Sequence, residues 1–139
     1  MNTIKILIVE DEPLYADQLE LLIDKLGYQH LNTLDNSDDV MQQLMEALPD
    51  LILMDIHIRG NHDGIELTEM IHQKHTIPVI FITSLQDDLT FNRASRTEAI
   101  NFLVKPFNEL QLQRSIELAI KKLVTSSVSQ EVDDWEEYL

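Results

Sequence analysis

Charged and polar side chains follow the apolar runs of this sequence, at the points where those runs end. Glu10 and Asp11 come after the first run, and Asp55 closes the third. Thr83 follows the fourth run and Lys105 follows the fifth. Carboxylates, a hydroxyl and an ammonium group can together bind a divalent cation and the oxygens of a phosphate group. These five residues are therefore the candidates for function.

Three clustered carboxylates, those of Glu10, Asp11 and Asp55, would repel one another unless a cation shared their charge. Oxygen ligands favour Mg²⁺, which keeps several waters and is often bound together with phosphate oxygens; Mn²⁺ could substitute for it. A carboxylate beside Mg²⁺ and an ammonium group can attack phosphorus to give an acyl phosphate. Asp55 is the predicted nucleophile, because the end of a buried strand would hold it in place.

The elements that must position these residues are strand-length apolar runs that alternate with amphipathic segments. The predicted strands are Ile4–Val9, Tyr28–Leu34, Leu51–Ile56, Val79–Ile82 and Phe102–Val104. This alternation is typical of βα units around a parallel sheet, with the more polar Tyr28–Leu34 at an edge. Ligands of such sheets bind outside the carboxyl ends of the strands, so the candidate residues should meet at one edge.

Helices are predicted in the segments between the strands and after Pro106. The first should end at Gly27, and others should begin near Ser37 or Asp38, near Gly64 and within 86–89. The last helix is predicted to fade in the polar stretch 125–127. We therefore expect one domain over residues 1–124, followed by 125–139 as a mobile acidic tail or the start of a linker to an output domain.

Composition excludes several classes of function. The 139 residues include 10 Lys plus Arg and 25 Asp plus Glu, and the resulting charge of −15 repels nucleic acid and anionic lipid. There is no cysteine, which excludes disulfides and thiol chemistry. Neither a signal-peptide pattern nor an apolar run of about 20 residues occurs, so we expect a cytoplasmic protein that binds neither nucleic acid nor membrane.

Five short motifs occur in an order and at intervals that resemble response regulator receiver domains. They are Val9-Glu10-Asp11-Glu12-Pro13, Leu53-Met54-Asp55-Ile56, Asp63-Gly64, Phe81-Ile82-Thr83-Ser84 and Val104-Lys105-Pro106-Phe107. The resemblance extends from about Ile4 to Val124. It implies a flavodoxin-like (βα)5 fold with strand order 2-1-3-4-5. It also implies a module of a two-component phosphorelay that catalyses only its own phosphorylation and dephosphorylation.

The resemblance implies a role for each residue of the acidic cluster. Asp55 would accept a phosphoryl group from a sensor histidine kinase, a histidine phosphotransfer protein or a small phosphodonor. Asp11 and Asp55 would bind Mg²⁺ directly and Glu10 would bind it through water. The backbone carbonyl of His57 would complete the protein ligands.

The resemblance also implies how phosphorylation would change the surface of the domain. Lys105 and Thr83 would hold the phosphoryl group, and Phe102 would turn inward as Thr83 moves toward it. Residues 86–124 would form the surface for a homodimer or another partner.

The chain departs from the family pattern after the acceptor. Arg59 stands where many receivers have proline, and the loop before Asp63-Gly64 is predicted to be one residue longer. Leu85, two residues after Thr83, falls where the family tunes access of water to the phosphoryl group, and its bulk predicts a longer-lived phosphorylated state.

Two other functions would use part of the same set of residues. An aspartyl-phosphate phosphatase commonly has a second acid two residues beyond its nucleophile, where this chain has His57. A receiver that works without phosphorylation would not need all the acidic, hydroxyl and lysine positions that are present. The output stays open, because the chain could act alone through protein contacts or belong to a longer regulator.

Overall fold

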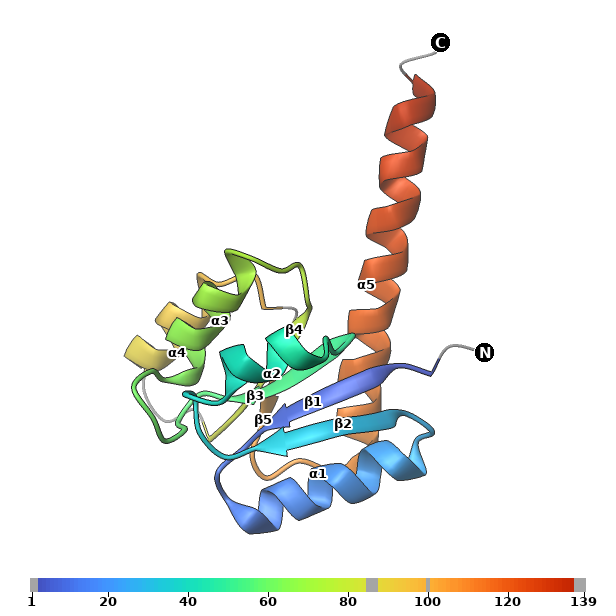
Figure 1. The fold of residues 1–139 in the computed structure, drawn as a ribbon. Helices are drawn as coiled ribbons and strands as arrows, with labels where there is room; N and C mark the ends of the chain where they lie inside the picture. Colours follow the sequence, from blue (N-terminus) through green and yellow to red (C-terminus); the bar gives the residue numbers. More distant parts are fainter. Residues whose placement is uncertain (1–2, 85–87, 100, 137–139) are drawn as a thin grey trace.

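The computed structural model describes residues 3–84, 88–99 and 101–136 (Figure 1). The strands are β1 (Lys5–Val9), β2 (Gln29–Leu34), β3 (Leu51–Asp55), β4 (Val79–Thr83) and β5 (Asn101–Val104). The helices are α1 (Pro13–Lys25), α2 (Val40–Glu46), α3 (Gly64–His72), α4 (Asp88–Ser95) and α5 (Glu109–Glu136). Strands and helices alternate along the described chain, as the sequence predicted.

The five strands form one parallel sheet in the order β2-β1-β3-β4-β5. The flavodoxin-like topology is therefore confirmed, and β2 lies at an edge as its polar sequence indicated. Every residue of β3 and β4 is buried, whereas β2 has no fully buried residue. The central strands are thus the most rigid support that the sheet offers to a functional group.

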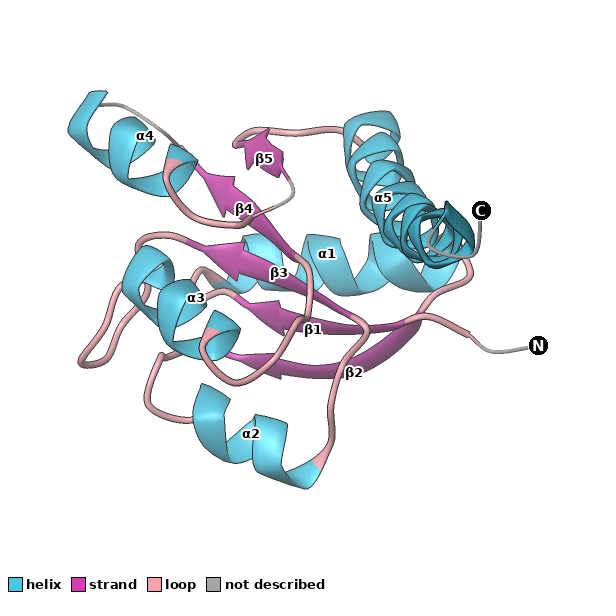
Figure 2. Cartoon of the chain, turned by 90° about the horizontal axis from the view of Figure 1, so that it is seen from above, coloured by secondary structure: helices cyan, strands magenta, loops and turns pink. Residues whose placement is uncertain are grey.

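Alternation of side chains along β1 divides the core into two layers. Leu7 and Val9 pack in a cluster with residues of α2, α3 and α4. Ile6 and Ile8 point to the opposite face and pack with residues of α1 and α5. Figure 2 shows α1 and α5 on one side of the sheet and α2 and α3 on the other. Covering both faces explains why the central strands are apolar up to their last residues, Asp55 in β3 and Thr83 in β4.

The connection from β1 to α1 is short, and its ends are fixed. Pro13 occupies the first position of α1, where the missing N–H is not needed for a helical hydrogen bond. At the C-terminal end of α1, Gly27 has a φ of +90°, which is the left-handed conformation that stops the helix. Residues 10–12 are consequently held between a buried strand and a packed helix.

The last helix is longer than the sequence predicted. α5 spans 28 residues to Glu136 and continues through 125–127, so the expectation that it fades there is wrong. Thr and Ser lower helix propensity only slightly, and no Gly or Pro follows Pro106 to stop the helix. In Figure 1 its C-terminal part extends beyond the sheet. Neither this helix nor any other in the described segments is long and apolar enough to cross a membrane.

Candidate functional site

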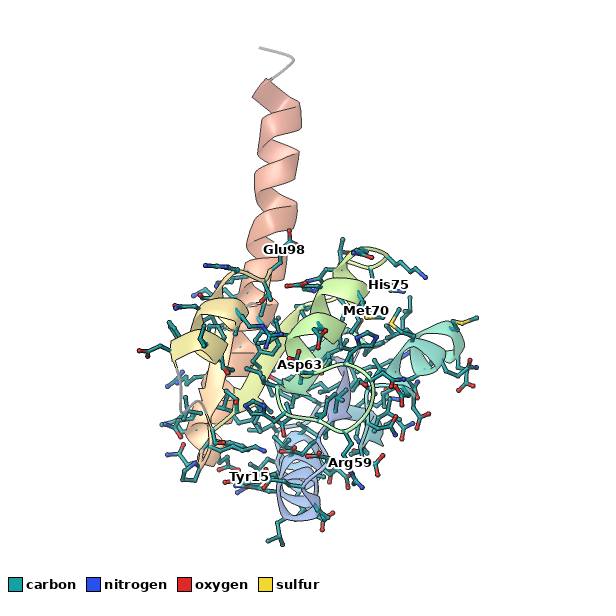
Figure 3. The ribbon with its side chains drawn as sticks, turned by 90° about the vertical axis from the view of Figure 1, so that its left-hand side faces the viewer. Tyr15, Arg59, Asp63, Met70, His75 and Glu98 are labelled. Carbon is teal, nitrogen blue, oxygen red and sulfur yellow. The ribbon has the colours of Figure 1, made fainter. Side chains whose placement is uncertain are left out.

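The three predicted carboxylates meet at the edge of the sheet where the strands end, which is the edge viewed in Figure 3. β1 and β3 are neighbours with Val9 opposite Met54, so the residues that follow these two lie side by side. Oxygens of Glu10, Asp11 and Asp55 lie within 4.8 Å of one another. Glu10 and Asp55 are buried and Asp11 is partly exposed. The predicted acidic cluster is therefore present, with one member open to solvent.

Lys105 reaches this cluster from the end of β5. Its Nζ lies 2.5 Å from Glu10, 3.2 Å from Asp55 and 3.0 Å from Glu12. The ring of Tyr15 lies beneath the ammonium group, with its centroid 4.3 Å away. A buried ammonium group is thus held by carboxylates and an aromatic face, a setting that keeps it charged and points it at Asp55.

The crowding of charge changes the ionisation of the site. Burial, followed by the adjacent Asp55 carboxyl, raises the pKa of Glu10 to about 8, even though Lys105 acts in the opposite direction. Burial opposes the charge of Lys105, but Glu10, Asp55 and Glu12 together raise the pKa of its ammonium group. One positive charge does not neutralise the cluster, and a proton on Glu10 relieves part of the remaining repulsion.

Thr83 ends β4 next to the same cluster. Its side chain is fully buried, and among the described residues its Oγ1 has no hydrogen-bond partner. Its backbone carbonyl accepts a hydrogen bond of 2.8 Å from the amide of Lys105. A buried hydroxyl without a partner is costly, so Thr83 Oγ1 is a free donor for a polar group at this edge of the sheet.

Phe102 lies on β5 beside β4 and is half-buried. Its ring centroid is 5.8 Å from that of Phe81 in the core and 5.8 Å from that of Phe91 on α4. It therefore connects the central sheet with a surface helix. A rotation of Phe102 coupled to Thr83 stays a prediction.

The start of the β3–α3 loop (residues 56–63) passes close to Asp55. The amide of His57 donates to Asp55 Oδ1 at 3.2 Å, while a role for the His57 carbonyl as a metal ligand stays a prediction. Gly64 approaches so closely that a Cβ there would lie 2.1 Å from the carbonyl oxygen of Asp55. The Asp63 side chain caps α3 by accepting a hydrogen bond from the Glu66 amide. The Glu66 side chain in turn accepts a hydrogen bond from the Asp63 amide. The Asp-Gly pair thus brings the loop back onto the strand end.

The middle of the same loop is fixed to the loop after β2. The amide of Ser37 donates to the carbonyl of Arg59 at 2.8 Å, and the amide of His62 donates to Ser37 Oγ at 3.1 Å. Gly60 has a φ of +114°, and a Cβ there would lie 2.2 Å from Ser37 Oγ. The contact between Ser37 and Gly60 therefore fixes the conformation of the β3–α3 loop, in which Arg59 stands where many receivers have proline.

Arg59 and Tyr15 were not among the predicted site residues. Arg59 Nε lies 3.9 Å from Asp11, and Figure 3 shows Arg59 and Tyr15 on the same side of the molecule. Arg59 was noted only as a departure from the family pattern, and no charge pattern in the sequence marks Tyr15. Leu85, expected to limit access of water, lies outside the described residues.

The donor set fits Mg²⁺. Glu10, Asp11 and Asp55 offer hard carboxylate oxygens from two adjacent strand ends, and the partly exposed Asp11 leaves a side open to water. Mg²⁺ prefers few protein oxygens and keeps several waters, which matches a cluster that is open on one side. The excess negative charge around Lys105 also favours a second cation.

Comparison with known proteins agrees with this geometry. The profile of the response regulator receiver domain family matches residues 6–117. The sensory transduction protein LytT of Bacillus subtilis is 28% identical over 115 residues, which are 81% of this chain and 46% of that protein. The transcriptional regulatory protein YvrH of the same organism is 26% identical over 91% of this chain and 53% of its own length. The chain thus spans about half the length of these relatives.

A solved structure gives a nearer match. The receiver domain of a modulated diguanylate cyclase from Desulfovibrio desulfuricans is 39% identical, with a TM-score of 0.82, over 87% of this chain and 96% of the other. The match of the family profile covers most of the chain, including every strand residue except Lys5 at the start of β1. The chain belongs to the receiver domain family of two-component response regulators.

Proposed function

We propose that Asp55 is the phosphate acceptor of a Mg²⁺-dependent phosphorelay. The observation that carries the proposal is the placement of Asp55 with two other carboxylates within 4.8 Å and with Lys105 Nζ at 3.2 Å. The phosphodonor is a phosphohistidine on a sensor histidine kinase or histidine phosphotransfer protein, or a small acyl phosphate. This donor class is proposed from membership in the receiver family.

In the proposed reaction, a carboxylate oxygen of Asp55 attacks phosphorus and the bond from phosphorus to the donor breaks, with its electron pair going to the donor. Glu10, Asp11, Asp55 and the His57 carbonyl would hold Mg²⁺, which neutralises charge on the transferring phosphoryl oxygens when bound. Lys105 pairs with one of those oxygens. Burial of Asp55 at the end of β3 fixes the direction of attack.

The unpartnered hydroxyl of Thr83 supports the next step. After transfer, Thr83 Oγ1 donates a hydrogen bond to a phosphoryl oxygen, which satisfies a group that otherwise has no partner among the described residues. Movement of Thr83 leaves room for Phe102 to rotate inward. The surface of 86–124 then changes and binds a partner or a second copy of the chain.

Beryllofluoride with Mg²⁺ tests the proposal, because it mimics a phosphoryl group without a chemical step. We expect changes in backbone amide NMR signals at Thr83 and Phe102 in the wild type and none in Asp55→Asn. The Glu46→Gln variant, on the exposed end of α2, is a matched control that should respond as the wild type does. Equal responses from the wild type and Asp55→Asn would overturn the assignment.

A further inference from the structure

Two cations divide the carboxylates of the acidic cluster between them. Lys105 pairs with Glu10 and Asp55 and leaves Asp11 aside. Asp11 instead lies 3.9 Å from Arg59 Nε. Within the described residues, Arg59 is the one basic side chain at ion-pair distance from Asp11. The carboxylate that faces solvent thus has a cation of its own.

Arg59 has a second carboxylate within reach. Its Nη2 lies 3.6 Å from Asp35 Oδ2 in the loop after β2. Asp11, Asp35 and Arg59 line the same groove. Arg59 thus reaches both carboxylates at once, and its side chain is 68% exposed, so it can release Asp11 and keep Asp35 without a rearrangement of the core.

The backbone that carries Arg59 does not share this freedom. The hydrogen bond from Ser37 to the Arg59 carbonyl and the close approach of Gly60 to Ser37 fix the loop on both sides. Release of Asp11 by Arg59 therefore needs only a rotation of its side chain. Because the backbone is held, the guanidinium group would remain in the neighbourhood of Asp11.

We infer that Arg59 is a built-in counter-ion of Asp11 that competes with the divalent cation and weakens its binding. The inference rests on the proposed function, because it assumes that Asp11 is a Mg²⁺ ligand. Mg²⁺ must displace Arg59 from Asp11, and it must then bind near the positive charge that Arg59 keeps. Both effects lower the affinity of the site for Mg²⁺.

The size of the effect follows from exposure. Arg59 is largely exposed and Asp11 only partly so, and an ion pair at the surface contributes at most about 1 kcal/mol, which is about fivefold in affinity. We therefore expect Arg59→Gln to bind Mg²⁺ about two- to fivefold more tightly than the wild type, and Arg59→Glu to bind it more tightly still. Arg114→Gln is the matched control, because Arg114 is similarly exposed and pairs with Glu117 on α5.

Isothermal titration calorimetry with MgCl₂ measures these affinities directly and does not depend on phosphorylation. The increase in Mg²⁺ affinity of Arg59→Gln over the wild type should become smaller as the ionic strength rises from about 0.01 M to about 1 M, because the Debye length falls from about 30 Å to about 3 Å. Equal or weaker Mg²⁺ binding by Arg59→Gln would overturn the inference, and so would an equal gain in Arg114→Gln.

The same titration separates the inference from the proposed function. If the wild type and all variants fail to bind Mg²⁺, the proposed function fails. If the wild type binds Mg²⁺ and Arg59→Gln binds it no more tightly, only the inference fails. If Arg59→Gln is phosphorylated more slowly at unchanged Mg²⁺ affinity, Arg59 acts on the phosphodonor and the counter-ion assignment is wrong.

Discussion

The edge where the strands end and the face formed by α4 and β5 are built differently. At the edge, Asp55 ends a fully buried strand, and the loop after it is hydrogen-bonded to Ser37. On the face, α4 buries only Thr90 and Ala94, and Phe91 is 47% exposed. Phosphoryl transfer needs fixed groups, whereas a surface that changes on phosphorylation needs loosely packed ones.

The largest effect is expected at the rigid edge, in Lys105→Met. This variant removes the ammonium group that lies 3.2 Å from Asp55, while the other ligands remain. We expect phosphorylation by acetyl phosphate to slow roughly 100-fold, as when one stabilising donor is lost from a transition state. Lys74→Met, at an exposed position after α3, should keep the wild-type rate. A Lys105→Met rate within threefold of the wild type would contradict the role of Lys105.

The rigidity of the edge is itself tested by Gly60→Ala. The new Cβ would meet Ser37 Oγ at 2.2 Å in a left-handed backbone conformation. We expect a loss of about 2 to 3 kcal/mol of unfolding free energy, measured by urea denaturation.

Gly27→Ala is the control for backbone strain alone. Gly27 also has a positive φ, of +90°, but a Cβ there would meet nothing within 4 Å. Placing an alanine in this left-handed conformation is expected to cost about 1 kcal/mol. Equal losses in the two variants would show that the contact between Gly60 and Ser37 contributes nothing.

On the face of α4 and β5, truncation of a side chain should lower the stability of the fold without changing Mg²⁺ binding at the acidic cluster. Phe91→Ala removes a ring that packs against Phe102 from a half-exposed position. We expect a loss of about 1 to 2 kcal/mol of unfolding free energy and unchanged Mg²⁺ affinity. A more than twofold change in Mg²⁺ affinity would indicate that the two regions are not separable in the unphosphorylated protein.

The subtlest prediction concerns the proton on Glu10. Its pKa is about 8 in the folded protein and 4.5 when unperturbed, so the unfolded state ionises first as the pH rises. Without Mg²⁺, this group therefore stabilises the fold fully below about pH 4.5, and its contribution is lost as the pH rises to about 8. Urea midpoints across this range should fall more in the wild type than in Glu10→Gln. Urea midpoints that fall equally with pH in the wild type and in Glu10→Gln would contradict the raised pKa of Glu10.

Sequence patterns were sufficient to predict the sheet and the acidic cluster. Strand order followed from the resemblance, and each observed strand begins and ends within one residue of its prediction. Local sequence determines where a strand ends, and a parallel sheet brings those ends together. For that reason the sequence alone is enough to group Glu10, Asp11 and Asp55.

Other features depended on contacts that local patterns do not encode. Ser37 and Gly60 meet across two loops, and the lysine that Tyr15 supports is distant in the sequence. The predicted end of α5 is too early, because the polar stretch 125–127 looks like a helix stop and polar residues alone do not end a helix. The division into residues 1–124 and 125–139 stays a prediction.

The most direct test is to locate the phosphoryl group after incubation with acetyl phosphate. Tandem mass spectrometry of the peptide that contains Asp55 should show one phosphoryl group on that residue when Mg²⁺ is present. The label should be absent when EDTA removes the metal. A phosphoryl group on another residue, or equal labelling of Asp55 in EDTA, would contradict the assignment of this edge as a Mg²⁺-dependent phosphoacceptor site.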